Sequence, residues 1–185
     1  MKNAHINDNI YEVKGGVILK RFKPTYKIDK VSNIPFVLLE RDNIKGIMFD
    51  VDNTLTTLGK GITEDNRKWI EEAKKLGYKI CLVSNTLNVK KVRKIMTDLD
   101  IYGLYFARKP STKAMAMALN IMDVKKEEAV LVGDQLFTDV LGANRFGIKS
   151  ILVNPLSKKE GIYTSIKRPF ERMVMKKLEK ESAND

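Results

Sequence analysis

Short apolar runs alternate with segments of helical periodicity from residue 45 onward, and this alternation constrains the fold of the chain more than any other feature. The runs expected to be strands are 45–51, 79–85, 103–107, 129–134 and 149–154. The segments expected to be helices are 63–77, 88–99, 111–122 and 137–147. Strands that are apolar throughout are typical of a parallel sheet with helices on both faces. The sequence therefore predicts an α/β fold, with a Rossmann-like parallel sheet sandwiched by helices.

The segments on either side of this core are expected to be short additions to a single domain. Residues 1–44 are predicted to form an N-terminal extension that packs on the core at 45–155, and residues 156–185 a basic C-terminal helical tail. An amphipathic helix is expected after Pro169, where apolar residues are interspersed with basic ones. Such a helix packs on its own domain, on a partner or on a lipid surface, and we expect its own domain to be the contact.

The composition excludes several kinds of site. His5 is the only histidine and Cys81 the only cysteine, which removes histidine-rich zinc sites, Ser-His-Asp triads and internal disulfides. The longest unbroken apolar run, at 34–39, is far shorter than the roughly 20 residues that span a bilayer. The first residues lack the apolar segment of a secretory signal, so the chain is expected to be cytoplasmic. Its net charge of +11 favours anionic partners, such as phosphorylated metabolites, nucleic acid or anionic lipid.

Polar residues stand at the points where the predicted strands end. In an open parallel sheet, ligands bind at the carboxyl ends of the strands, so these side chains are expected to lie at one edge. The candidates are Asp50, Asp52, Asn53 and Thr54 at the first strand, Ser84 and Asn85 at the second, Lys109 after the third, and Asp134 and Asp139 after the fourth. One such residue is usually a solvated strand end or a cap, but several in register indicate a site.

The acids in this set predict a metal. Asp50 and Asp52 would leave the same face of a strand, and Asp134 would join them at the edge of the sheet. About three negative charges within a few ångström would force a proton onto one of them unless a cation intervened. Oxygen ligands without sulfur or imidazole suit Mg²⁺, which favours a substrate phosphate as a further ligand.

The remaining residues of the set predict a phosphate. Lys109 and the hydroxyl of Ser84, with Asn85 beside it, would supply positive charge and hydrogen bonds for phosphate oxygens. The turn at Asn53 and Thr54 would add backbone N–H donors for the same anion.

The motifs DVDNTL, LVSN, RKP and GDQLFTD, in this order and spacing, resemble the four motifs of the haloacid dehalogenase superfamily of phosphatases. The resemblance covers roughly residues 45–155. It implies that Asp50 is the nucleophile that forms an aspartyl-phosphate, and that Asp52 is the acid/base. It also implies that Ser84 and Lys109 hold the phosphoryl group.

The same resemblance implies a Mg²⁺ cofactor and its ligands. Magnesium would be bound by the Asp50 carboxylate, the main-chain carbonyl of Asp52 and Asp134. Asp139 would orient the metal shell or Lys109. An acid at position 52 favours hydrolysis over a long-lived phosphoenzyme, because the pumps of the superfamily carry another residue there.

A narrower resemblance extends over roughly residues 20–155. The stretches FKPTYKIDKVSNIPFVLLERDNIKGIMFDVDNTL, ARKPSTKAMAMAL and VGDQLFTDVLGANRFGIKSILVNPL are similar to the YqeG-type subfamily, in subfamily IIIA, which includes phosphatidylglycerophosphate phosphatases. Thr86 and the flap sequence TLTTLGKG depart from the subfamily pattern. The resemblance implies an anionic phospholipid headgroup as the substrate, with the protein peripheral on the inner face of a membrane.

The spacing of the motifs leaves no room for a large cap domain. The intervals from Asp52 to Ser84 and from Ser84 to Lys109 each hold one helix and one strand, with a flap in the first. An open site suits a macromolecular or membrane-embedded substrate, or a neighbouring subunit as a lid. Four cations follow the second strand: Lys90, Lys91, Arg93 and Lys94. They suit the headgroups of an anionic bilayer, and they equally fit one solvated helix face.

Three functions stay open at this point. The first is Mg²⁺-dependent phosphomonoester hydrolysis, with phosphatidylglycerophosphate as the expected substrate. The second is the same chemistry on a soluble nucleotide, a sugar phosphate or a nucleic-acid end, although a nucleic-acid partner is not favoured. The third is a basic binding module that retains the pocket without catalysis. Asp52 and Lys109 speak against it, because a pure binder has no use for them.

Overall fold

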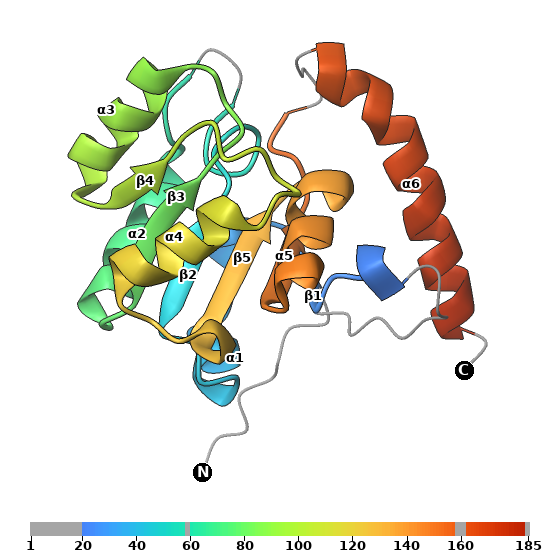
Figure 1. Ribbon diagram of the computed structural model, residues 1–185, viewed down its shortest axis with the longest axis horizontal. Coiled ribbons are helices and arrows are strands. Elements are labelled where there is room, and N and C mark those ends of the chain that lie inside the picture. The colour runs from blue at the N-terminus through green and yellow to red at the C-terminus, as the bar shows by residue number, and fades with distance from the viewer. Residues whose placement is uncertain (1–19, 58–59, 158–161, 184–185) are drawn as a thin grey trace.

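The computed structural model describes residues 20–57, 60–157 and 162–183, and these form one parallel sheet with helices packed around it (Figure 1). The sheet has six strands in the order β1-β6-β5-β2-β3-β4. Their bounds are β1 Tyr26–Ile28, β2 Gly46–Phe49, β3 Lys79–Val83, β4 Tyr102–Leu104, β5 Ala129–Gly133 and β6 Lys149–Val153. Every neighbouring pair runs parallel. The predicted α/β fold is confirmed.

Six α-helices and four short helical turns accompany these strands within the described ranges. The α-helices are α1 Phe36–Arg41, α2 Glu64–Lys75, α3 Val89–Leu99, α4 Lys113–Met122, α5 Leu141–Phe146 and α6 Ile162–Ala183. The 3-10 turns are η1 Lys20–Phe22, η2 Val31–Asn33 and η3 Lys126–Glu128, and η4 at Leu136–Val140 is a π-helical turn.

The two faces of the sheet are covered by different helices. Ile47 and Phe49 of β2 pack in the cluster that contains the buried residues of α2 and α3. Met48, between them, faces the opposite cluster, which contains the buried residues of α4 and Ala143 of α5. Figure 1 shows α4 and α5 in front of the sheet. Because both faces are buried, the strands read as continuous apolar runs without a polar alternation.

The N-terminal segment contributes an edge strand that the sequence did not predict. Tyr26–Ile28 of β1 pairs with β6 along Ile151–Val153. The backbone N–H of Thr25 donates to Ser150 Oγ at 3.2 Å, and the N–H of Ser150 donates to Thr25 Oγ1 at 3.0 Å. Three residues with a lysine in the middle carry too little pattern to be recognised as a strand. Residues of the predicted extension therefore complete the sheet of the predicted core.

Two predicted elements were wrong at their boundaries. The strand expected at 103–107 ends at Leu104, because Phe106 and Arg108 have φ values of 52° and 54°, which a strand does not allow. The helix expected at 137–147 is a π-helical turn followed by the short α5. In that turn, the N–H groups of Asp139 and Val140 both donate to the carbonyl of Gln135.

The tail helix also differs from its prediction. It begins at Ile162 rather than after Pro169, which lies inside a helix of 22 residues. A proline removes one hydrogen bond from a helix, and a helix anchored on a domain tolerates that loss. The anchor is on its own domain, as expected. Glu171 accepts a hydrogen bond from the N–H of Phe137 at 3.0 Å, and Leu178 is fully buried. None of the helices built from described residues is both long and apolar enough to cross a membrane.

Candidate active site

Asp50 is the first residue after β2 and lies at the carboxyl edge of the sheet. Its N–H continues the ladder by donating to the carbonyl of Val132 at 2.9 Å. The side chain is buried, and its Oδ1 accepts a hydrogen bond from Lys109 Nζ at 2.6 Å. Its other oxygen, Oδ2, is buried and has no hydrogen-bond partner among the residues that the structure describes. A buried carboxylate oxygen of this kind is costly unless a ligand uses it.

Lys109 reaches the same edge from the segment that follows β4. It is 4% exposed, and its Nζ lies 2.6 Å from Asp50 Oδ1 and 2.7 Å from Asp139 Oδ1. Its main chain is held by Asn85, whose Oδ1 accepts from the Lys109 N–H at 2.7 Å and whose Nδ2 donates to the Lys109 carbonyl at 3.0 Å. In this structure Asn85 positions Lys109, and its predicted contact with phosphate stays a prediction.

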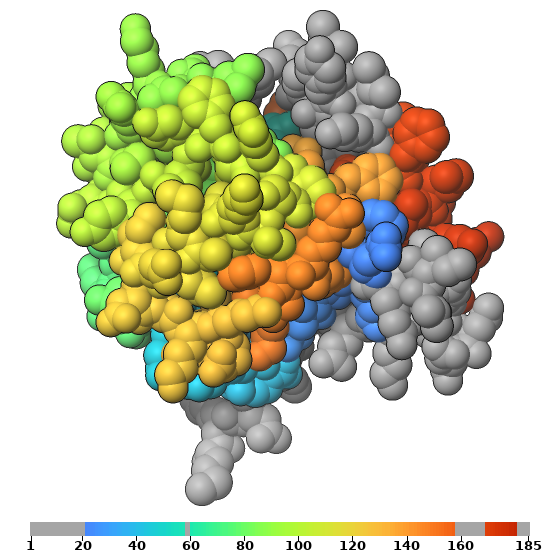
Figure 2. All heavy atoms as spheres, in the orientation of Figure 1, coloured from blue at the N-terminus to red at the C-terminus, as the bar shows by residue number. Residues whose placement is uncertain are grey.

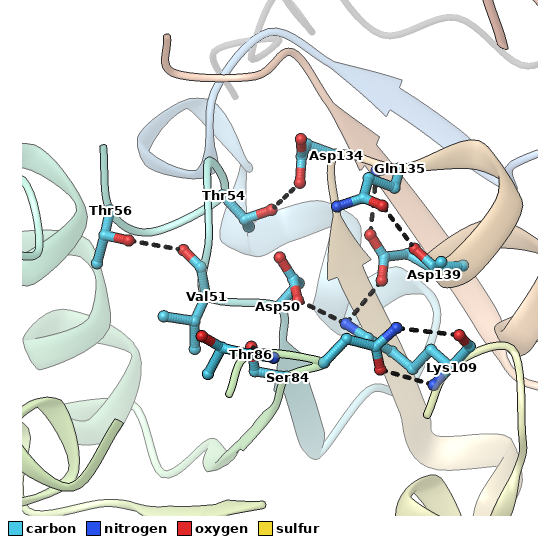
Figure 3. Close-up of polar contacts among 12 residues, drawn as sticks. Asp50, Val51, Thr54, Thr56, Ser84, Thr86, Lys109, Asp134, Gln135 and Asp139 are labelled. Atoms are coloured by element: carbon cyan, nitrogen blue, oxygen red, sulfur yellow. Dashed lines mark hydrogen bonds and ion pairs between the residues drawn. The ribbon is translucent and has the colours of Figure 1, made fainter. Parts of the chain in front are cut away.

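Three buried carboxylates meet beside this lysine. One oxygen each from Asp50, Asp134 and Asp139 lies within 4.8 Å of the others. Asp134 Oδ1 accepts a hydrogen bond from Thr54 Oγ1 at 2.8 Å. Asp139 Oδ2 accepts from the N–H of Gln135 at 3.0 Å. Figure 3 shows the three acids pointing toward one another from two neighbouring strand ends and η4.

Burial and charge act against each other in this cluster. Burial raises the pKa of Asp50 to about 6, because the positive charge of Lys109 only partly compensates for lost hydration, and Asp139 adds repulsion. Burial also opposes charge on Lys109, but the carboxylates of Asp139 and Asp50 outweigh it and hold the pKa of the lysine above its usual value. The ammonium of Lys109 is thus shared between Asp50 and Asp139, two of the three carboxylates. With its all-oxygen donors and the partnerless Asp50 Oδ2, the set fits a hard divalent cation.

Asp52 is not a member of this cluster, although it was expected to join Asp50 and Asp134 at the edge of the sheet. That its side chain shares a face with Asp50 stays a prediction. The side chain of Asp52 is about half exposed, and its Oδ1 forms an ion pair with Lys91 Nζ at 2.6 Å. The third member of the carboxylate cluster is instead Asp139, which was predicted to be a supporting residue.

Ser84 begins a series of capping hydrogen bonds that places Lys91. Its buried Oγ accepts from the N–H of Thr86 at 3.2 Å, and Thr86 Oγ1 accepts from the N–H of Asn88 at 3.3 Å. Asn88 then caps α3 by accepting from the N–H of Lys91 at 3.0 Å. Thr86, which departs from the subfamily pattern, therefore has a local structural role.

The turn after Asp52 is held from α2 by a residue that sequence reasoning missed. Asn53 has a φ of 64° and is buried together with Thr54. Asn66 is 1% exposed and donates through Nδ2 to the carbonyls of Thr54 at 3.2 Å and Leu55 at 3.3 Å. Its signal in the sequence is position, because it precedes the buried Trp69 by three residues on the apolar face of α2.

Gly133 is a second missed residue, and it gives a testable prediction. A Cβ at this position would lie 2.3 Å from Asp139 Oδ2 and 2.4 Å from its Cγ. We expect Gly133→Ala to displace Asp139 from Lys109, to lower the free energy of unfolding by about 1–3 kcal/mol and to reduce activity. Urea unfolding measures the first effect. The control is Gly61→Ala, where a Cβ meets no described atom within 4 Å, and equal stability losses in both variants would contradict the prediction.

Comparisons with known proteins show the family of the chain. The family model described as haloacid dehalogenase-like hydrolase matches residues 47–109, and the model described as HAD-hydrolase-like matches residues 106–164. The probable phosphatase YqeG of Bacillus subtilis (strain 168) is 38% identical over 166 residues, which cover 89% of this chain and 96% of that protein. The chain belongs to the haloacid dehalogenase-like hydrolases. The resemblance seen in the sequence, including its YqeG-type subfamily, is confirmed.

Two further relatives of this hydrolase cover different shares of it. Phosphatidylglycerophosphate phosphatase 1 of Arabidopsis thaliana is 29% identical over 147 residues, which cover 74% of this chain but 42% of that protein. The solved cobalt-bound form of deoxy-D-mannose-octulosonate 8-phosphate phosphatase from Haemophilus influenzae aligns with a TM-score of 0.50 at 16% identity. It covers 78% of this chain and 94% of that chain, and it supports the fold alone.

Among the residues that the structure describes there is no large cap domain, as predicted. Between Asp52 and Ser84 the described residues form the turn, α2 and β3, and between Ser84 and Lys109 they form α3 and β4. Within the described ranges no cap domain covers the carboxyl edge of the sheet, and the site is called open in this sense.

Proposed function

We propose that this hydrolase is a Mg²⁺-dependent phosphomonoesterase that forms an aspartyl-phosphate on Asp50. The observation that carries the proposal is the Asp50 carboxylate, buried with one oxygen held by Lys109 and the other without a described partner. A carboxylate with so little solvation and a cation beside it is suited to attack a phosphoryl group that the cation attracts.

The first half-reaction transfers the phosphoryl group to the protein. An oxygen of Asp50 attacks phosphorus, and the bond from phosphorus to the ester oxygen breaks. Asp52, as general acid, gives its proton to the departing ester oxygen. Lys109 and Ser84 hold phosphoryl oxygens, so the negative charge of the transferring group is matched by an ammonium and a hydroxyl donor.

The second half-reaction restores the protein. Asp52 takes a proton from water, the water oxygen attacks phosphorus, and the bond between phosphorus and Asp50 breaks to release inorganic phosphate. In the structure Asp52 Oδ1 is paired with Lys91 Nζ, and the proposed proton transfers require the half-exposed Asp52 carboxylate to reach the phosphoryl group.

Asp50 and Asp134 are the side chains proposed to hold Mg²⁺, with the main-chain carbonyl of Asp52 as the third protein ligand. Asp139 is also in the cluster, but its Oδ1 is shared with Lys109 and its Oδ2 with Gln135, which suits a residue that orients the others. When bound, Mg²⁺ would neutralise charge on the phosphoryl oxygens next to these carboxylates.

Phosphatidylglycerophosphate is the proposed substrate and phosphatidylglycerol the product, at the inner face of a membrane. The similarity to the Arabidopsis enzyme supports this, as do the open site and the net charge of +11, which favours an anionic surface. An open phosphatase site also suits a soluble phosphomonoester, such as a nucleotide or a sugar phosphate, and the experiment must separate the two.

We expect purified full-length protein with Mg²⁺ to release phosphate from phosphatidylglycerophosphate in mixed micelles at a higher kcat/KM than from a panel of soluble phosphomonoesters. Removal of divalent metal with EDTA is expected to stop the reaction, and added Mg²⁺ to restore it. A preference for a soluble ester would overturn the lipid assignment alone. Absence of turnover on every phosphomonoester would leave a binding module and refute the phosphatase proposal.

A further inference from the structure

The segment that carries Lys109 alternates between the site and the surface. Ala107 and Lys109 are buried, whereas Phe106 is 47% exposed and Arg108 is exposed. Phe106 and Arg108 both have positive φ, a conformation that bulky residues rarely adopt. Strain of this kind tends to occur where a side chain is presented for a function. The backbone that brings Lys109 into the site therefore presents Phe106 and Arg108 outward beside it.

A second exposed apolar side chain stands on the neighbouring loop. Leu87 follows β3 and is 78% exposed, the largest exposed fraction among the described large hydrophobic residues. The two loops are joined, because the N–H of Ala107 donates to the carbonyl of Ser84 at 3.0 Å and Asn85 holds the main chain of Lys109. Leu87 and Phe106 are thus exposed on connected loops that follow β3 and β4, at the edge of the sheet that carries the site.

Exposed cations accompany these two side chains. We call the group the rim, and its members are Leu87, Lys90, Arg93, Phe106 and Arg108. In Figure 2 the green and yellow-green atoms of this part of the chain form the upper left of the visible face. The rim combines two apolar side chains with three positive charges, and Lys90, in the first turn of α3, does not stabilise the helix itself because the N-terminus of a helix favours negative charge. Their placement points to an anionic partner.

We infer that the rim docks on an anionic phospholipid bilayer and brings the open site to a phosphate ester at the membrane surface. This inference rests on the proposed function, since it names the surface from which the substrate would be taken. Apolar side chains that enter the interface beside cations that face anionic headgroups are the features of interfacial binding. A second copy of the chain fits this surface poorly, because three like charges would face three others. The phosphates of a nucleic acid would pair with the cations, but they would not contact the apolar side chain of Leu87 favourably.

The outer face of α6 is the rival surface on the same chain. Phe170 and Met173 are 58% and 61% exposed and lie one turn apart on this helix. The helix is anchored on η4 through Glu171, but it contributes none of the residues proposed to contact the phosphoryl group. The rim is favoured because Ser84 and Lys109 belong to the same loops as Leu87 and Phe106.

Sedimentation of the full-length protein with vesicles tests the rim directly. We expect binding to phosphatidylcholine vesicles that contain phosphatidylglycerol, weaker binding to phosphatidylcholine alone, and weaker binding at high salt. The double variant Leu87→Ser with Phe106→Ser is expected to bind the anionic vesicles at least about tenfold more weakly. The control is Val37→Ser with Leu76→Ser, because these side chains are 55% and 51% exposed at the opposite edge of the sheet. It is expected to bind like wild type.

Activity on a soluble phosphomonoester separates this inference from the proposed function. The rim variant is expected to keep wild-type kcat/KM on the soluble ester and to lose it only on vesicle-embedded phospholipid. Vesicle binding does not require turnover. The binding assay therefore tests the inference even if the protein shows no phosphatase activity. Leu87→Ser alone is the second variant, in case the Phe106 substitution disturbs its loop.

Three results would overturn the inference. The first is wild-type vesicle binding by the rim variant. The second is a loss of binding in Phe170→Ser with Met173→Ser but not in the rim variant, which would assign docking to α6. The third is wild-type protein that binds a polynucleotide but not anionic vesicles.

Discussion

Replacement of Asp50 by asparagine is expected to reduce the rate of phosphate release at least about 10⁴-fold, because the amide cannot act as the nucleophile. Asparagine has nearly the same shape and still accepts a hydrogen bond from Lys109, so the fold should be retained. Phosphate release under saturating Mg²⁺ is the measurement. Equal rates for wild type and Asp50→Asn would remove Asp50 from the reaction.

The same variant is expected to be more stable than wild type at neutral pH when divalent metal is absent. The pKa of Asp50 is raised from 3.8 to about 6 in the folded protein, chiefly by burial. The folded state therefore binds this proton more tightly than the unfolded state, and wild type loses stability as pH rises through that interval. Asp50→Asn does not ionise and should gain about 1–3 kcal/mol relative to wild type above pH 6.

Denaturant unfolding of both metal-free proteins across this pH range checks the sign. The difference in the free energy of unfolding should be small near pH 4, grow up to about pH 6 and then stay constant. A wild-type protein that is the more stable of the two at pH 7 without metal would contradict the raised pKa of Asp50.

Replacement of Lys109 by methionine is expected to cost about 3–5 kcal/mol of stability, because the carboxylates of Asp50 and Asp139 lose the cation buried between them. Activity should fall at least about 10³-fold, since the lysine also holds the phosphoryl group. Thermal unfolding and phosphate release measure the two effects.

Two companion variants separate charge from shape at this position. Lys109→Met with Asp139→Asn removes one negative charge along with the positive one, and it is expected to regain part of the stability but none of the activity. Lys109→Arg keeps the charge, but its planar group does not fit a pocket that leaves the lysine 4% exposed. Unchanged stability in Lys109→Met would mean that the ion pairs contribute nothing to the fold.

The carboxyl edge of the sheet was predictable because each site residue follows an apolar run. Asp50, Ser84, Lys109 and Asp134 all follow such runs, and parallel strands bring these points together whatever the loops do. The loops themselves were less predictable. Asp52 forms an ion pair with Lys91 of α3, and the apolar run before Asp52 gave no indication of that partner.

Other features had weak signals or none. The edge strand β1 is three residues long, which is below the length at which alternation is recognisable. In the π-helical turn at Leu136–Val140, two N–H groups share the carbonyl of Gln135. This hydrogen-bond arrangement has no recognisable pattern in the amino-acid sequence. Asn66 did leave a signal, because a polar residue on the apolar face of a helix needs a partner.

Acid-quench trapping of the phosphorylated protein tests the central claim most directly. Wild type and Asp52→Asn would be mixed with p-nitrophenyl phosphate, whose leaving group departs without a proton, then quenched in acid and digested. The account predicts a hydroxylamine-sensitive phosphate on Asp50, and more of it in Asp52→Asn, because that variant lacks the base that activates water. Phosphate release by the wild type, with no phosphate found on Asp50 in either protein, would contradict the aspartyl-phosphate mechanism.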